Sequence, residues 1–247
     1  MRLLEKFAAT GPWVPAFRRE SKVLRSAPTW LLATAALLAK STPAAAAGLA
    51  LVLAVDVSAS VTADTYVLQR NGIARAFEDP RVAGAISAVP GGIEALVLEW
   101  SDPERIAVTV GWTRLADGAG AAAFAAAVRA TQRNSKGLTA IGPALLAAAA
   151  EFEHMPEPAE RRIIDISGDG IANFGVSPSV ARDSVVAARI TINGLVILTG
   201  EPWLEAYYRR NVVGGPGAFV AVARDFASFA KAMQRKLVLE IASAQTQ

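Results

Sequence analysis

The strongest constraint on the fold is a regular alternation, from residue 48 onward, of short apolar runs with longer alanine-rich segments. The first run, residues 49–57, is almost continuously apolar, as expected of a parallel strand covered on both faces. Further strands are predicted at residues 93–100, 105–112, 162–167, 191–198 and 218–223. Helices are predicted at residues 62–78, 118–132, 141–154, 179–189, 203–211 and 225–241.

Six strands separated mostly by helices predict an α/β fold, with a doubly wound, mostly parallel sheet and helices on both faces. One connection differs, because only residues 101–104 (SDPE) join the second strand to the third. So short a link suits an antiparallel hairpin and cannot cross over to a parallel strand. We therefore expect a six-stranded sheet with one antiparallel edge strand.

The first 47 residues differ in composition from the rest. Residues 1–28 hold six basic and two acidic side chains, and residues 29–39 form an uncharged apolar run. That run is shorter than the ~20 residues that span a bilayer, but it fits the hydrophobic part of an export signal. Small residues after Pro43 suit signal cleavage. We predict a signal peptide or N-terminal extension at residues 1–47 and one domain at residues 48–247.

Other interpretations of this segment stay open: a gene start placed too early, an uncleaved membrane anchor, or an amphipathic helix on a cytosolic protein.

The N-terminal segment also accounts for the basic character of the chain, which has a net charge of +3 and an isoelectric point near 9.4. Residues 1–47 hold seven Lys or Arg and two Asp or Glu, whereas residues 48–247 hold 18 and 20. The predicted domain is therefore mildly acidic, and its charge does not favour nucleic acid as a partner.

Acidic and hydroxyl side chains gather where the predicted strands end, which is where doubly wound sheets bind ligands. Asp56, Ser58 and Ser60 follow the first strand. Asp169 follows the fourth strand, and Thr139 lies in a loop that the antiparallel strand and the next helix return to this edge. All five residues offer oxygen atoms, which suit Mg²⁺, Mn²⁺ or Ca²⁺ better than zinc or copper. The chain has no cysteine, so cysteine-based metal sites and disulfides are excluded.

The pattern D-x-S-x-S at residues 56–60, with Thr139 in GLTAIG and Asp169 in SGDG, resembles the metal-ion-dependent adhesion site (MIDAS) of the von Willebrand factor A superfamily. The resemblance covers about residues 48–242 and includes the order of elements. It is closer still to a bacterial subfamily of exported A domains of unknown function. The segments that resemble that subfamily are residues 97–101, 165–170, 192–195, 207–209 and 214–220.

This resemblance implies a function as well as a fold. It implies that Ser58, Ser60 and Thr139 bind the metal through their hydroxyls, and that Asp56 and Asp169 bind it directly or through water. Sites of this kind are left open, and an acidic side chain of a protein partner completes them. Ala59 stands where glycine is more frequent, and SGDG where many A domains have TDG, but neither departure removes a ligand.

Three alternatives compete with a metal-dependent binding site: a helix cap, a phosphohydrolase and a serine hydrolase. Asp and Ser after a strand also cap helices, as Ser60 or Thr62 could here. A phosphohydrolase with Asp56 as nucleophile would need a second acid two residues later, where Ser58 stands. A serine hydrolase needs a base, and the only histidine, His154, is predicted at a helix end far from this edge. The sequence also lacks phosphate-loop, dinucleotide and nucleophile-elbow motifs.

Further acidic and glycine-rich positions are interpreted as structural. Asp102 and Glu104 are expected in a solvated turn, and Asp165 lies in a buried strand, where it needs a partner that the sequence does not identify. Residues 214–217 are interpreted as a turn at the opposite edge of the sheet.

We therefore expect an exported, non-enzymatic domain of the von Willebrand factor A type, in the periplasm or outside the cell. It is expected to bind a protein ligand with an acidic side chain through Mg²⁺, or Mn²⁺ or Ca²⁺. No nucleic acid is expected as a partner, and membrane contact is expected only through the N-terminal segment, if that stays uncleaved. The alternatives are a metal-dependent phosphohydrolase-like enzyme and a structural subunit of an envelope assembly.

Overall fold

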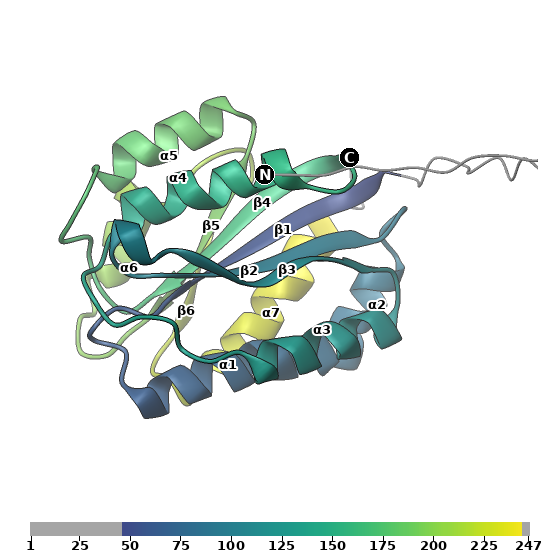
Figure 1. Cartoon of the computed structure of the whole chain (residues 1–247), viewed down its shortest axis with the longest axis horizontal. Coiled ribbons are helices and arrows are strands. Elements are labelled where there is room, and N and C mark those ends of the chain that lie inside the picture. Colours follow the sequence, from purple (N-terminus) through teal and green to yellow (C-terminus); the bar gives the residue numbers. More distant parts are fainter. Residues whose placement is uncertain (1–45, 244–247) are drawn as a thin grey trace, which may run out of the picture. The chain divides into compact units, whose positions relative to one another are not determined.

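The computed structural model describes residues 46–243, which form a sheet between two layers of helices (Figure 1). The strands are β1 (Ala47–Asp56), β2 (Ile93–Trp100), β3 (Ala107–Leu115), β4 (Ala159–Gly168), β5 (Thr191–Ile197) and β6 (Val220–Ala223). The helices are α1 (Ala63–Glu78), α2 (Pro80–Ser87), α3 (Gly118–Ala130), α4 (Ile141–Glu151), α5 (Pro178–Ala187), α6 (Leu204–Asn211) and α7 (Phe229–Ala242). Short 3-10 helices lie at Pro103–Arg105 and Phe152–His154.

The six strands form one sheet in the order β3-β2-β1-β4-β5-β6. Only β2 and β3 pair antiparallel, and β3 lies at one edge. The α/β class and the single antiparallel edge strand predicted from the sequence are therefore confirmed. β1 lies between β2 and β4, and all of its residues are buried, which explains why its sequence is almost continuously apolar.

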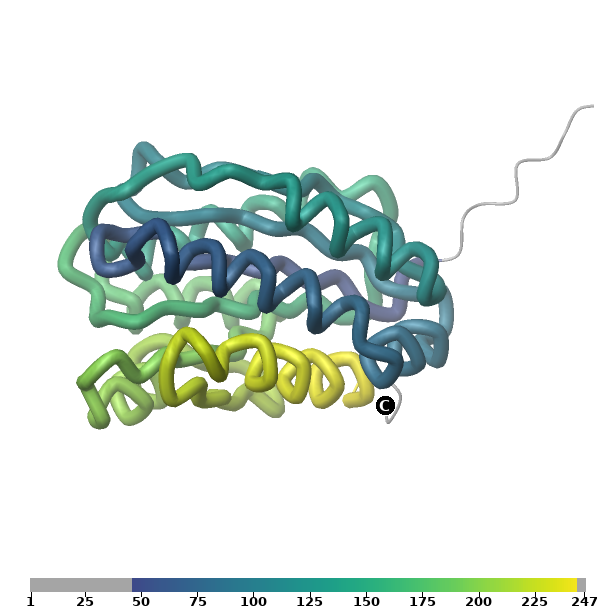
Figure 2. Tube along the Cα trace, turned by 90° about the horizontal axis from the view of Figure 1, so that it is seen from below, coloured from purple at the N-terminus to yellow at the C-terminus, as the bar shows by residue number. Residues whose placement is uncertain are grey.

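Side chains from alternate positions of the strands enter two separate hydrophobic cores. Leu51 and Leu53 pack toward α1, α2, α3 and α7, whereas Val52 and Ala54 pack toward α4, α5 and α6. The same two layers of helices are visible in Figure 1, and Figure 2 shows α1 lying between α3 and α7. Apolar contact on both faces thus fixes the sheet, and with it the positions at which the strands end.

The structure differs from the predicted elements mainly at capping residues. Asp79 ends α1, as expected, but its carboxylate also accepts a hydrogen bond from Arg81 N–H (2.9 Å) and begins α2. Pro80 at the first helical position favours this start, because it has no N–H to leave unpaired. α7 begins at Phe229 instead of residue 225, because Asp225 caps a preceding turn.

β1 begins at Ala47, one residue before the predicted start of the domain. Residues 1–45, and with them nearly all of the predicted export segment, lie outside the described residues. The division into a segment 1–47 and a domain 48–247 therefore stays a prediction. Within residues 46–243, no helix combines the length and the apolarity needed to cross a membrane.

The partner that Asp165 needs is Lys236 of α7. Lys236 Nζ lies 2.7 Å from Asp165 Oδ2 and also pairs with Glu240, and all three side chains are fully buried. Asn193 Nδ2 of β5 donates a hydrogen bond to Glu240 Oε1 (2.7 Å). Burial, with the charge of Asp165 as a second cause, raises the pKa of Glu240 to about 7. The cluster anchors α7 to the centre of the sheet.

Replacing Lys236 by Met should leave the buried Asp165 carboxylate without its cation. We expect Lys236→Met to lower the free energy of unfolding by about 3–5 kcal/mol, measured by urea denaturation at neutral pH. Lys231→Met is the matched control, because Lys231 is exposed on the same helix. Its effect should stay within about 0.5 kcal/mol, and equal effects of the two variants would contradict the anchoring role.

Candidate metal centre

The D-x-S-x-S segment begins at the last residue of β1, and its Asp and Ser side chains become more exposed along the chain. Asp56 and Ser58 are fully buried, whereas Ser60 is exposed. Ser58 N–H donates to Asp56 Oδ1 (2.7 Å), and the hydroxyl oxygens of Ser58 and Ser60 lie 3.2 Å apart. The cap of α1 is Thr62, whose hydroxyl accepts from Thr65 N–H (3.2 Å). Ser60 therefore does not cap the helix, and its hydroxyl is available to the site.

Asp169 reaches the same cluster from the loop after β4. The Ser60 hydroxyl donates to Asp169 Oδ1 at 2.6 Å, although the two residues are far apart in the sequence. They meet because β1 and β4 pair in parallel, with Val55 opposite Ser167 near the ends of both strands. Four of the five predicted ligands thus form one cluster linked by hydrogen bonds and close oxygen contacts.

Thr139, the fifth predicted ligand, lies on residues 131–140, a loop without regular structure. Ala59 N–H donates to Gly137 O (2.8 Å) and ties this loop to the first one. Asn173, after β4, accepts Thr139 N–H through Oδ1 (2.8 Å) and donates its own N–H to Thr139 O (3.0 Å). These contacts tie the Thr139 loop to the segments after β1 and β4, which carry the other four predicted ligands.

Asp102 is a second anchor of the Thr139 loop. Its Oδ1 accepts Leu138 N–H (2.8 Å), and a Cβ on Gly137 would lie only 1.9 Å from its Oδ2. Glycine is thus required at residue 137, since any side chain would collide with the carboxylate. Glu104 is exposed, as expected of a solvated turn, whereas Asp102 lies in the same turn but is only partly exposed, because the Thr139 loop contacts its carboxylate.

Arg133 holds the backbone of the D-x-S-x-S segment. Its Nη2 donates to the carbonyl oxygens of Val57 (2.6 Å) and Ser58 (2.8 Å). This fixes the backbone between Asp56 and Ser60 without using a ligand side chain. Arg133, Asp102 and Asn173 were missed from the sequence, because contacts between loops leave no periodic pattern or motif.

Asp56 Oδ2 is buried and has no hydrogen-bond partner among the described residues. Burial raises the pKa of Asp56 to about 7, even though hydrogen bonds from Ser58 act in the opposite direction, and the charge of Asp169 adds to the rise. Burial also raises the pKa of Asp169. An unpaired buried carboxylate is costly, and a bound cation would remove that cost. The site therefore suits a divalent cation.

The donor set of this site consists of two carboxylates and three hydroxyls, with no nitrogen or sulfur. Across the described part of the chain, no group of three or more His, Cys, Asp or Glu side chains could hold a metal. Hydroxyl oxygens would therefore have to complete the coordination, which hard cations such as Mg²⁺ accept.

The fold is that of von Willebrand factor A domains, which solved structures share at low sequence identity. Proximal thread matrix protein 1 from the mussel byssus aligns with a TM-score of 0.59 at 19% identity, over 78% of this chain and 46% of that one. A further structure of that protein, with a zinc-occupied MIDAS motif, aligns with a TM-score of 0.55 at 18% identity, over the same shares. A von Willebrand factor type A protein from Catenulispora acidiphila aligns with a TM-score of 0.53 at 21% identity, over 79% and 42%.

The pilus adhesin SpaC from Lactobacillus rhamnosus GG aligns with a TM-score of 0.56 at 13% identity, over 78% of this chain and 30% of that one. This chain thus spans less than half the length of these structures. No curated protein matches it. Residues 46–245 match the family model described as "Protein of unknown function (DUF1194)", and the chain belongs to that family.

The unpaired Asp56 carboxylate should make the stability of the metal-free protein depend on pH. Because its folded pKa of about 7 lies above the ordinary pKa of 3.8 for this side chain, this group lowers stability as pH rises from about 4 to 7. Asp56→Asn removes the charge, so we expect it to stabilise the protein by roughly 1–3 kcal/mol at about pH 8 and to have little effect at about pH 4. Urea denaturation in EDTA at both pH values measures this, and a destabilised variant at about pH 8 would contradict it.

Proposed function

We propose that this protein is an exported, non-enzymatic binding domain that engages a protein ligand through a divalent cation. The proposed cation ligands are Asp56, Ser58, Ser60, Thr139 and Asp169. The observation that carries the proposal is the unpartnered, buried oxygen of Asp56 beside a cluster made only of oxygen donors. When bound, the cation supplies a positive centre that attracts an acidic group of the partner.

The exposure of the site residues favours a ligand that approaches from one side. Asp56 and Ser58 lie at the buried floor, whereas Ser60 reaches solvent. Asp169 and Thr139 are only 5% and 8% exposed, so the protein covers most of their surface. We propose Mg²⁺ as the cation, because carboxylate and hydroxyl oxygens suit hard cations. The zinc-occupied MIDAS motif of the mussel protein supports a divalent cation without deciding which one.

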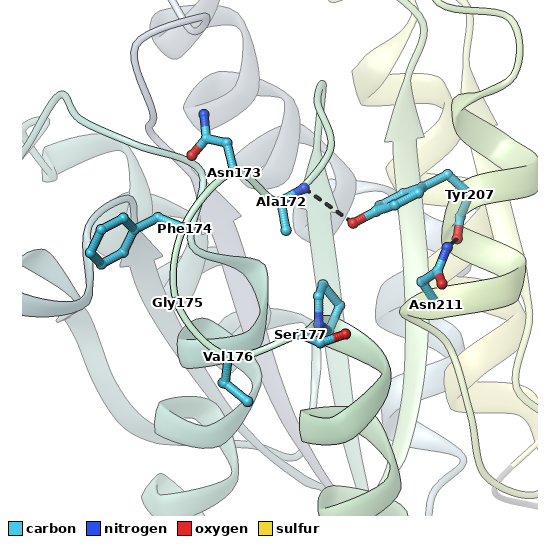
Figure 3. Close-up of a pocket in the computed structure, with 9 residues that line it drawn as sticks. Ala172, Asn173, Phe174, Gly175, Val176, Ser177, Tyr207 and Asn211 are labelled. Atoms are coloured by element: carbon cyan, nitrogen blue, oxygen red, sulfur yellow. Dashed lines mark hydrogen bonds between the residues drawn. The ribbon is translucent and has the colours of Figure 1, made fainter.

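A protein is favoured as the ligand because apolar side chains are exposed around this edge of the sheet. The exposed apolar residues are Leu138, Ile171, Phe174, Val176 and Trp203. Phe174 and Val176 also line a cavity of about 540 Å³ between residues 172–178 and α6. Figure 3 shows this loop facing Tyr207 and Asn211 of the helix. Exposed apolar patches rimmed by polar groups are typical of protein interaction sites.

Export and the lack of catalysis are also part of the proposal. The predicted signal segment at residues 1–47 supports export, as does the likeness to a byssus matrix protein and a pilus adhesin. A binding role is favoured over hydrolysis because Ser58 occupies the position of the second acid that an Asp nucleophile would need. The single histidine, His154, is exposed at the end of a 3-10 helix that precedes β4, at the opposite edge of the sheet from the site.

Metal binding is tested by calorimetry with Mg²⁺ and Mn²⁺ on the purified protein. We expect wild type to bind one cation, and Asp169→Ala to weaken binding by at least roughly tenfold, because it removes a ligand and the acceptor of the Ser60 hydroxyl. Asp183→Ala is the control, since that acid is exposed on α5 with only Arg182 as a partner. Absence of binding by wild type would refute the proposed site.

Partner binding is tested by capture from an envelope extract with the full chain as bait. We expect Mg²⁺-dependent capture of a protein that EDTA releases, because an acidic partner group needs the cation. The Asp169→Ala bait should capture much less of that protein than the Asp183→Ala bait. Capture that is equal with and without EDTA would instead favour a structural subunit, and phosphatase activity lost in Asp169→Ala would favour the enzyme.

A further inference from the structure

Asp56 Oδ2 and the hydroxyl oxygen of Tyr208 both lack a hydrogen-bond partner among the described residues, and both approach Gly168. Tyr208 of α6 is fully buried, and its hydroxyl has no hydrogen-bond partner within residues 46–243. A Cβ placed on Gly168 would lie 2.5 Å from the Tyr208 hydroxyl and 3.0 Å from Asp56 Oδ2. The two oxygens therefore approach one point, at the end of β4, from α6 and from β1.

This close approach explains why residue 168 is glycine. Gly168 does not have a left-handed φ, so its backbone conformation is open to other residues. A side chain at this position would nevertheless collide with the Tyr208 hydroxyl, because contacts of 2.5 Å to a Cβ are far inside van der Waals distance. Glycine thus leaves room for the hydroxyl beside the carboxylate.

The two oxygens are chemically complementary. A carboxylate oxygen accepts hydrogen bonds, and a phenol at neutral pH donates one. Leaving both groups buried and unpaired is unfavourable, because neither group regains the hydrogen bonds that it would make with water. A hydrogen bond between the Tyr208 hydroxyl and Asp56 Oδ2, or one water molecule bonded to both, would give each group a partner.

We propose that Tyr208 is a positioning residue of the cation site, whose hydroxyl donates a hydrogen bond to Asp56 Oδ2 directly or through one buried water. The inference rests on the proposed function, because it assigns Tyr208 to the cation site of Asp56. The bond orients the carboxylate whose other oxygen accepts Ser58 N–H. It leaves the second lone pair of Oδ2 for the cation or its water.

The neighbouring tyrosine gives α6 a second contact with the site. The Tyr207 hydroxyl accepts Ala172 N–H at 3.2 Å, in the loop that begins with Asp169 (Figure 3). The consecutive tyrosines thus reach the floor of the site and its rim. Because Tyr207 contacts the rim, the matched control is Tyr66 of α1, whose hydroxyl donates to Glu99 (2.8 Å) and not to a proposed ligand.

The first experiment compares Mg²⁺ affinity in Tyr208→Phe and Tyr66→Phe by calorimetry. Each substitution keeps the buried ring and removes only the hydroxyl. We expect the affinity of Tyr208→Phe to fall about tenfold or more, as for other groups that orient metal ligands, and that of Tyr66→Phe to stay within about twofold of wild type. Urea denaturation checks that both variants remain folded.

The second experiment measures the ¹³C chemical shift of Tyr208 Cζ, which carries the hydroxyl. If Tyr208 acted only by packing, this shift would not change with the state of Asp56. The chain has three tyrosines, so protein labelled with ¹³C at the tyrosine Cζ gives three resonances, which Tyr→Phe variants assign. We expect the Tyr208 resonance to shift when Mg²⁺ is added and, in metal-free protein, when Asp56 is replaced by Asn. Tyr66 is the internal reference, because its hydroxyl already donates to Glu99 (2.8 Å).

The outcomes separate this inference from the proposed function. Wild-type protein that binds no Mg²⁺ contradicts the proposed function, and the positioning role with it. Wild-type binding together with unchanged affinity in Tyr208→Phe overturns the positioning role alone. A Tyr208 resonance that does not respond to Asp56→Asn overturns it as well.

Discussion

The site depends on a difference between two buried carboxylates of the sheet. One of them has a buried cation as its partner, and the other has none among the residues described. Asp165 on β4 has Lys236 Nζ at 2.7 Å, so its charge is compensated within the protein. Asp56 on β1 accepts one backbone N–H and has no cation among the residues described. Because an uncompensated buried charge costs several kcal/mol, the first carboxylate contributes to the fold and the second is free to attract an external cation.

The parallel pairing of β1 with β4 places the site, and contacts between loops give it rigidity. Residues 131–140 contain no helix or strand, yet hydrogen bonds tie them to three other loops. Arg133 donates to the loop after β1, and the backbone of this segment donates to Asp102 after β2 and to Asn173 after β4. Such contacts tie Thr139 to Asn173, in the loop that begins with Asp169, before any ligand arrives. A site ordered in advance loses less conformational entropy when it binds.

The sequence predicted the sheet, its antiparallel edge and the cluster of Asp56, Ser58, Ser60 and Asp169, because these follow from apolar runs and from where strands end. It did not predict α2, since Asp79-Pro80 is compatible both with a helix end and with a helix start. Asp102, Arg133 and Tyr208 were also missed, because their roles arise from contacts between distant segments.

The two layers of helices are anchored differently, which decides where the protein can respond to a ligand. Moving α7 would separate Lys236 from Asp165 and leave buried charges unpaired, so this layer resists displacement. α6 instead meets the site through the Tyr207 hydroxyl and the unpaired hydroxyl of Tyr208, beside an open cavity. Small shifts of α6 break no buried ion pair that the structure describes. Cation or partner binding should therefore be accommodated on the α6 side of the sheet, while α7 stays in place.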